Sequence, residues 1–251
     1  MSLLSKDLNT LQAGSGYKFS ATKINDLGAA EYTLATIVVD ASSSVLAFSA
    51  QLEQAVKTIF KACDKSPRRD NLMLRLVQFS SVLTELHGFK LLSTIKEDDY
   101  NGILKIGGMT ALLDAADEAV AATGTYGKQL TAQDFLVNGI VVLVTDGENN
   151  SGSIYDPTKV RDNTAKVRSA ENLESLRTIL VGVTNDDNTL NTYLQTLKDD
   201  GGFDQYISIN KATPGKLAKL ADFISQSISS TSSALGSGAP STPISPAGFK
   251  F

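Results

Sequence analysis

The stretch Thr36-Ile-Val-Val-Asp-Ala-Ser-Ser-Ser44 decides the fold that we expect for this chain of 251 residues. It begins as an apolar, β-branched run and turns polar at Asp40. A short apolar run that is closed by polar residues is typical of a buried strand in a parallel sheet. Ligands of open α/β sheets bind where strands end. We therefore expect Asp40, Ser42 and Ser44 to present one carboxylate and two hydroxyls to a hard cation.

Two later stretches place polar residues at similar positions. The run Ile140-Val-Val-Leu-Val-Thr-Asp-Gly147 is a second buried strand, and it ends at Asp146. The run Gly107-Gly-Met-Thr-Ala-Leu-Leu-Asp114 puts Thr110 directly before a helical pattern. Strands alternate with helices along this part of the chain, which predicts parallel pairing and right-handed crossovers. We expect an α/β fold with a doubly wound, mostly parallel sheet of about six strands and helices on both faces.

These three motifs, in this order, resemble those of the von Willebrand factor type A (vWA) family, and in particular bacterial stand-alone members of it. The resemblance covers roughly residues 32–230. It implies a Rossmann-like vWA fold with a complete metal-ion-dependent adhesion site (MIDAS), formed by Asp40, Ser42, Ser44, Thr110 and Asp146. It also implies that one coordination position of the metal stays open for an Asp or Glu carboxylate of a partner.

The ligand set contains only oxygen atoms, which favours Mg²⁺ or Mn²⁺ over Zn²⁺ or Cu²⁺. Asp114 lies one helical turn beyond Thr110. It either orients groups around the metal or is a solvated carboxylate on the helix surface. Three further acidic residues near strand ends are interpreted as charges at the periphery of the site: Glu148, Asp186 and Asp187.

The resemblance implies a non-enzymatic, divalent-metal-dependent protein–protein interaction module. Its partner presents an acidic residue, and an ATPase or a component of an assembly fits this description. Two alternatives stay open. The first is a structural subunit of a larger assembly that uses the metal for stability. The second is a metal-dependent phosphohydrolase with Asp40 as nucleophile.

Two observations count against an enzyme. Phosphatases of the haloacid dehalogenase type need a second Asp two residues after the first, and Ser42 occupies that place. His87 is the only histidine, and it is far in sequence from the site motifs, so a Ser-His-Asp arrangement is not expected.

Composition limits the partners and the location. The net charge of −4 gives no basic footprint for nucleic acid or for an anionic membrane surface. The N-terminus lacks the pattern of a signal peptide, and no stretch is long enough to span a bilayer. Cys63 is the only cysteine, so no intrachain disulfide can form, and its helical neighbours predict a core position. We therefore expect a cytoplasmic protein.

The chain divides into three parts by composition. Residues 1–30 are an N-terminal extension, in which residues 17–21 alternate like a short edge strand. Residues 31–230 form the vWA domain. Residues 231–251 are rich in Ser, Gly and Pro and predict a flexible tail.

Helix ends are predicted from glycine positions and apolar spacing. The helix that starts after Thr110 is expected to end at the glycines of residues 124–127. Residues 130–137 predict a short helix of their own. The last helix is expected over residues 216–228.

Overall fold

The computed structural model describes residues 8–13, 16–238 and 242–249. In these residues an eight-stranded sheet has the order β1-β2-β5-β4-β3-β6-β7-β8. The strands are β1 (Leu8–Gln12), β2 (Lys18–Thr22), β3 (Glu31–Asp40), β4 (Leu72–Phe79), β5 (Leu83–Leu91), β6 (Leu136–Thr145), β7 (Ser175–Val183) and β8 (Gln205–Ile209). The helices of more than two turns are α1 (Ser49–Asp64), α2 (Leu112–Thr131), α3 (Thr158–Ser169), α4 (Asn188–Asp200) and α5 (Pro214–Ser237).

Strand β3 lies inside the parallel part of the sheet. It pairs in parallel with β4 on one side and with β6 on the other, and Val39 is in register with Val144. The expected parallel pairing of the two buried strands is therefore confirmed. Because both strands run in the same direction, their carboxyl ends, Asp40 and Thr145, reach the same edge of the sheet.

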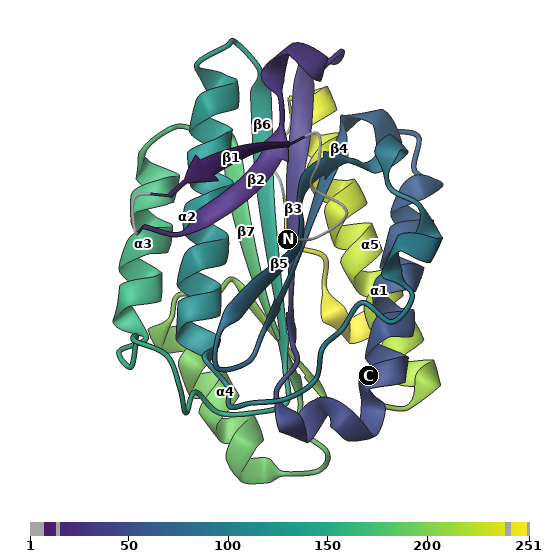
Figure 1. Ribbon diagram of the computed structural model, residues 1–251, viewed down its shortest axis with the longest axis vertical. Coiled ribbons are helices and arrows are strands. Elements are labelled where there is room, and N and C mark those ends of the chain that lie inside the picture. Colours follow the sequence, from purple (N-terminus) through teal and green to yellow (C-terminus); the bar gives the residue numbers. More distant parts are fainter. Residues whose placement is uncertain (1–7, 14–15, 239–241, 250–251) are drawn as a thin grey trace.

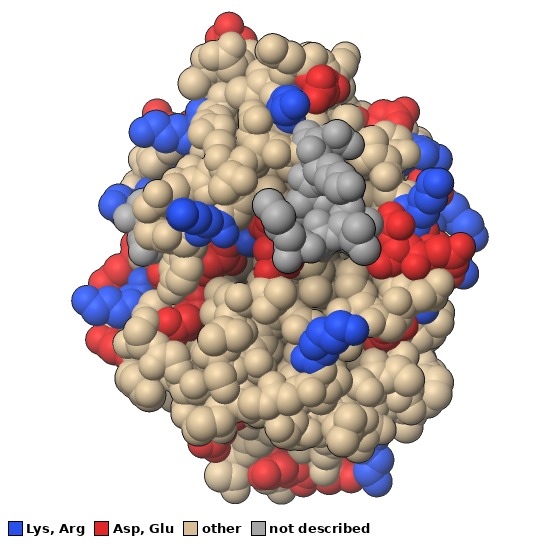
Figure 2. All heavy atoms as spheres, viewed as in Figure 1, with Lys and Arg blue, Asp and Glu red and all other residues tan. Residues whose placement is uncertain are grey.

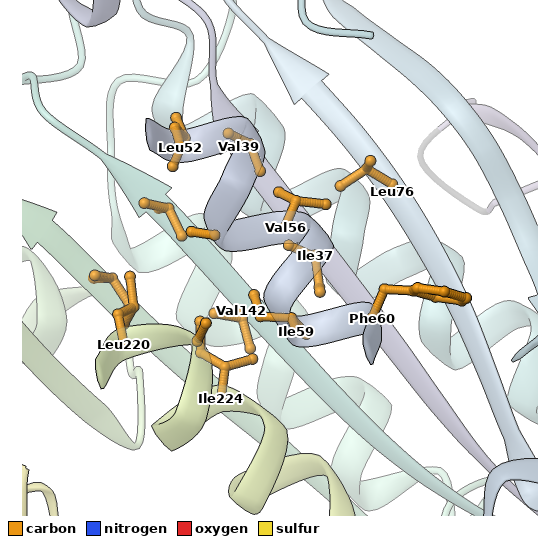
Figure 3. Packing of buried hydrophobic residues seen from close by; sticks show 14 of the residues in the cluster. Ile37, Val39, Leu52, Val56, Ile59, Phe60, Leu76, Val142, Leu220 and Ile224 are labelled. Carbon is orange, nitrogen blue, oxygen red and sulfur yellow. The ribbon is translucent and has the colours of Figure 1, made fainter. Parts of the chain in front are cut away.

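Helices cover both faces of the sheet (Figure 1), as expected. Helices α1 and α5 pack on one face, and α2, α3 and α4 pack on the other. Successive residues of β3 alternate between the two cores: Ile37 and Val39 face α1 and α5, whereas Val38 faces α2. Figure 3 shows Ile37 and Val39 beside Val56 of α1, and Val142 of β6 beside Ile224 of α5. Burial on both faces explains why these strands are continuous apolar runs.

The sheet has two more strands than the sequence predicted, and both come from the N-terminal extension. Strands β1 and β2 form an antiparallel pair, and β2 joins β5 in parallel through Ala21 and Phe89. The alternating segment at residues 17–21 is thus a strand, but β1 covers its outer side. Phe19 packs edge-on against Phe89, with ring centroids 6.1 Å apart. The extension is therefore part of the same sheet and core.

Helix α2 continues past the glycines that were expected to end it. A Cβ on Gly124 would lie 2.7 Å from a methyl carbon of Val167, and one on Gly127 would lie 2.4 Å from a methyl carbon of Leu173. These glycines therefore allow close packing of α2 against α3 and the segment after it, and they do not terminate the helix. The separate helix predicted for residues 130–137 is wrong, because α2 ends at Thr131 and β6 begins at Leu136.

The C-terminal helix is longer than predicted, and residues beyond it pack on the domain. Helix α5 runs to Ser237, and Leu235 is buried, so the boundary expected at residue 230 falls inside this helix. Ile244 and Phe249 pack against the core on the α1 side, and the ring of Phe249 meets Phe223 edge-on at 5.2 Å. Residues 239–241, 250 and 251 of the predicted tail lie outside the described residues.

His87 is buried in β5, and its ring is bonded at both nitrogens. Nδ1 lies 2.9 Å from the carbonyl oxygen of Gly88, and Nε2 lies 3.0 Å from the hydroxyl of Tyr100. Burial is the main reason that the pKa of His87 falls from 6.5 to about 4, and the nearby charges of Lys90 and Arg75 add to it. The ring is therefore neutral at physiological pH.

No helix within the described ranges is both long and apolar enough to cross a membrane.

We predict that Phe249→Ala lowers the free energy of unfolding by about 1–2 kcal/mol, because it removes a half-buried ring from the core. Urea denaturation of the full chain measures this loss. Thr242→Ala, an exposed position in the same segment, is the matched control and should leave stability unchanged. Equal stability of both variants and the wild type would show that the segment contributes nothing to the fold.

We predict that His87 destabilises the folded state as the pH falls through the window from 6.5 to about 4. In this window the unfolded chain binds a proton that the folded chain excludes. The full loss is about 3 kcal/mol, and it is complete below the folded pKa. Since His87 is the only histidine, its imidazole proton resonance identifies it without assignment. A titration of that resonance near pH 6.5 in the folded protein would contradict the prediction.

Candidate metal centre

Asp40 ends β3 and is buried, with 1% of its surface exposed. One carboxylate oxygen, Oδ1, accepts a hydrogen bond from the backbone N–H of Ser42 at 2.8 Å. The other, Oδ2, accepts one from the hydroxyl of Thr145 at 2.6 Å. Burial raises the pKa of Asp40, and these hydrogen bonds oppose the rise. The carboxylate is thus oriented by its own loop and by the end of β6.

Asp146 follows β6 and lies beside the serines of the first motif. Its Oδ1 accepts a hydrogen bond from the Ser44 hydroxyl at 2.7 Å, and the hydroxyls of Ser42 and Ser44 are 3.1 Å apart. Burial, with a further contribution from the negative charge of Asp40, raises the pKa of Asp146 to about 6. The bond from Ser44 opposes this rise. The two carboxylates are therefore close enough to repel each other.

Thr110 brings a third hydroxyl to the same place. It is 3% exposed and precedes α2. Its Oγ1 lies 3.3 Å from the position that a Cβ on Gly147 would occupy, so the hydroxyl sits against the backbone that follows Asp146. The structure thus brings together all five residues of the predicted site, from three loops at the carboxyl edge of the sheet. Their role as metal ligands stays a prediction.

The donor set fits a hard divalent cation. The causes that shift the pKa of Asp40 and of Asp146 include no cationic side chain, so neither carboxylate has a counter-charge among the described residues. Buried carboxylates are normally paired with a cation or bound to a metal. The part of the chain that the structure describes contains no cluster of three or more His, Cys, Asp or Glu side chains suited to a metal. Two carboxylates with three hydroxyls suit Mg²⁺ or Mn²⁺.

Asp114 fastens the loop after β6 to the first turn of α2. It is 7% exposed, so it is not a solvated helix carboxylate. Its two oxygens accept hydrogen bonds from the backbone N–H of Ser153 and of Ile154, at 2.9–3.1 Å, and from the Ser153 hydroxyl at 2.6 Å. Gly152 has φ +95°, and a Cβ there would lie 2.2 Å from the Asp114 carboxylate. Asp114 therefore positions the loop that carries Asp146.

Two asparagines that the sequence analysis did not assign to the site hold the same loop. The side-chain oxygen of Asn149 accepts a hydrogen bond from Leu113 N–H at 3.0 Å, and that of Asn150 accepts one from Thr110 N–H at 2.8 Å. In return, the Thr110 carbonyl accepts from the backbone of Asn150 and Ser151. No local sequence signal marks this role, because the N–H groups that the two asparagines bind lie 40 and 36 positions earlier in the chain, at the start of α2.

The three acidic residues assigned to the periphery have different surroundings. Glu148 is exposed. Asp186 forms an ion pair with Lys211 at 3.0 Å. Asp187 caps α4 by accepting hydrogen bonds from the backbone of Thr189 and Leu190. None of them bonds to the five residues of the candidate centre.

Cys63 is buried in the core, as predicted.

Solved structures with similar folds include several assembly and adhesion proteins. The PilB minor pilin from Streptococcus sanguinis, as its D319A mutant, aligns with a TM-score of 0.59 at 16% identity, over 90% of this chain and 67% of that one. The pilus adhesin SpaC from Lactobacillus rhamnosus GG aligns with a TM-score of 0.58 at 13% identity, over 85% of this chain and 31% of that one. At these identities the similarity shows a common fold.

Two further structures complete the comparison. A von Willebrand factor type A protein from Catenulispora acidiphila aligns at 14% identity with a TM-score of 0.52, over 90% of this chain and 49% of that one. Proximal thread matrix protein 1 from the mussel byssus, with a zinc-occupied MIDAS motif, aligns at 19% identity with a TM-score of 0.50, over 80% of this chain and 47% of that one. The chain thus spans half or less of these two proteins.

The search of curated protein sequences gave no match. The family model for the von Willebrand factor type A domain, in contrast, matches residues 36–226, which is most of the chain and includes all five residues of the candidate centre. Together with the sheet topology, this match shows that the chain belongs to the von Willebrand factor type A family.

Proposed function

We propose that this protein is a divalent-metal-dependent protein–protein interaction module. Asp40, Ser42, Ser44, Thr110 and Asp146 would hold Mg²⁺ or Mn²⁺, and an Asp or Glu of the partner would complete the coordination shell. The observation that carries the proposal is the buried carboxylate of Asp40 and the partly buried carboxylate of Asp146, which lie beside three hydroxyls and have no cationic partner. Bound there, the ion would neutralise the repulsion between the carboxylates and attract an external anion.

The family and its relatives support a binding role. A structural neighbour with a metal in its MIDAS motif indicates that this fold can hold an ion there. A minor pilin and a pilus adhesin share the fold, so a component of a protein assembly is a reasonable class of partner. An ATPase partner and the cytoplasmic location stay predictions from the sequence.

The surroundings of the site favour binding over catalysis. His87, the only histidine, is buried between the Gly88 carbonyl and the Tyr100 hydroxyl. It therefore cannot serve as a general base beside Ser42 or Ser44, because it lies inside β5 and those serines lie in the segment after β3. The position two residues after Asp40 is a serine, so the acid that a haloacid dehalogenase-like phosphatase needs is missing.

Affinity capture from a cell extract, with the captured protein identified by mass spectrometry, tests the function. Capture should occur with Mg²⁺ and fail with a chelator. Asp146→Asn, which keeps the side-chain shape, should abolish capture in either condition. Asp186→Asn lies at the same edge outside the site and is the matched control. Capture that survives both the chelator and Asp146→Asn would instead favour a structural subunit whose metal serves stability.

We predict that Mg²⁺ raises the melting temperature of the wild type and of Asp186→Asn, but not of Asp146→Asn. An ion that binds only the folded state stabilises it by about 2.7 kcal/mol at a concentration of 100 times its Kd. Differential scanning calorimetry with and without a chelator measures the shift. If neither Mg²⁺ nor Mn²⁺ changes the melting temperature of the wild type, the proposed metal site is wrong.

We predict that Asp114→Asn weakens Mg²⁺ binding about tenfold although residue 114 would not touch the ion. The amide has one acceptor oxygen in place of two, and its NH₂ would face the N–H donors of Ser153 and Ile154. Asp117→Asn, one turn along α2, is the control, because its bond from Asn163 can form to an amide oxygen. Titration calorimetry gives both affinities. If both variants lost the same amount of Mg²⁺ affinity, the effect would come from a general change in α2 and not from the bonds of Asp114.

A further inference from the structure

Large apolar side chains are exposed at few places in the described ranges, and most of these lie at the carboxyl edge of the sheet. Leu46 (69% exposed), Val82 (66%), Met109 (53%) and Tyr155 (69%) belong to loops at this edge. Leu136 (49%), at the start of β6, lies at the opposite edge. Exposed apolar residues that gather at one place, rather than singly, mark an interaction site.

Three of these residues lie on loops that are bonded to one another around the candidate metal centre. Leu46 comes two residues after Ser44, and Met109 directly precedes Thr110. The backbone N–H of Ser43 donates to the Gly108 carbonyl at 3.1 Å, which joins the first loop to the second. We call Leu46, Val82 and Met109 the apolar rim.

The β4–β5 turn, which carries Val82, is joined to the same loops. The Ser81 hydroxyl accepts a hydrogen bond from the backbone N–H of Met109 at 2.9 Å. Gly108 has φ +89°, and a Cβ there would lie 2.9 Å from the Ser81 hydroxyl, so the close approach requires glycine. The fold therefore holds Val82 and Met109 in neighbouring, defined positions.

The loops that carry the apolar rim are also free of charge. Residues 42–52, 79–84 and 106–113 contain no Lys, Arg, Asp or Glu. Figure 2 shows a broad area without charged side chains across the lower part of the molecule, where Figure 1 places the start of α1 and the segment before α2. On the side of these three segments, the candidate metal centre lies next to uncharged surface that includes apolar contact area.

We propose that the apolar rim is the specificity surface of the metal centre and that it selects a protein segment whose Asp or Glu is flanked by large apolar side chains. This proposal rests on the proposed function. The carboxylate would reach the ion while its neighbours cover Leu46, Val82 and Met109. Apolar contact excludes water, and ion–carboxylate attraction is stronger where water is excluded. An acidic residue between polar or charged neighbours would gain the ion contact alone.

A display library of random peptide loops, panned on the full-length protein in Mg²⁺ and eluted with a chelator, tests the proposal. The wild type should enrich loops with an Asp or Glu next to Leu, Ile, Phe or Met. The triple variant Leu46→Ser, Val82→Ser, Met109→Ser should still enrich acidic loops, but without apolar neighbours. The best loop from the wild type should bind the triple variant about tenfold more weakly, a loss expected when central apolar contacts are removed. Leu136→Ser, at the opposite edge, is the matched control and should behave as the wild type.

The outcomes separate this proposal from the proposed function. Metal-dependent enrichment of acidic loops with no preference for apolar neighbours would overturn the specificity surface and leave the metal-dependent module intact. Absence of any metal-dependent acidic enrichment would overturn both. The triple variant should keep the melting temperature of the wild type and its shift in Mg²⁺, because the three side chains are exposed. If Mg²⁺ no longer raised the melting temperature of the triple variant, the change in selected loops would be due to a damaged metal centre. That result would also overturn the proposal.

Discussion

The parallel pairing of β3 with β6 is the constraint on which the candidate centre depends. It brings Asp40 and Asp146 to one edge of the sheet and keeps them there through a continuous ladder of hydrogen bonds. Burial raises the cost of the charge on Asp146, and the charge of Asp40 adds a smaller repulsion, so the pKa of Asp146 rises to about 6. The fold thus places two carboxylates close together with no cationic side chain beside them. A divalent cation with oxygen ligands would balance their negative charge, and this is the physical basis of the proposed metal dependence.

One buried cation of the domain is paired with two carboxylates within the protein. Arg75 of β4 is 1% exposed and binds Glu118 of α2 through two hydrogen bonds, at 2.6 and 3.0 Å. It also bonds to Glu85 of β5, which in turn accepts from Ser20 of β2. This network joins the N-terminal strands to α2 on one face of the sheet. Two other buried carboxylates, Asp114 and Asp117, accept hydrogen bonds from uncharged groups instead of pairing with a cation.

The loops of the centre are held together largely by bonds that do not involve the side-chain oxygens of the five candidate ligands. Asp114, Asn149 and Asn150 fasten the segment after β6 to the start of α2, and the Gly108 carbonyl fastens the segment before α2 to Ser43. Such support lowers the conformational entropy that binding has to remove. Bonds from Ser43 to Gly108 and from Met109 to Ser81 also hold the apolar rim beside the candidate centre, so the two form one continuous surface.

The sequence by itself indicated the parallel strands of the central sheet through local patterns, and it indicated the residues of the candidate centre through those patterns together with the resemblance to the vWA family. Apolar runs that end at Asp40 and Asp146 are visible without knowledge of the fold. Tertiary structure alone decided features that depend on distant partners. Gly124 lies inside α2, where the absence of a Cβ leaves room for Val167 of α3, and the strand at residues 18–22 pairs with the edge of β5. Phe249 packs on a ring 26 positions earlier in the chain, at Phe223. The spacing of residues along the chain shows only the periodicity of a helix or strand. Contacts between remote segments depend on how side chains fit together and on backbone groups at a sheet edge that lack a partner, and both arise only once the sheet has formed.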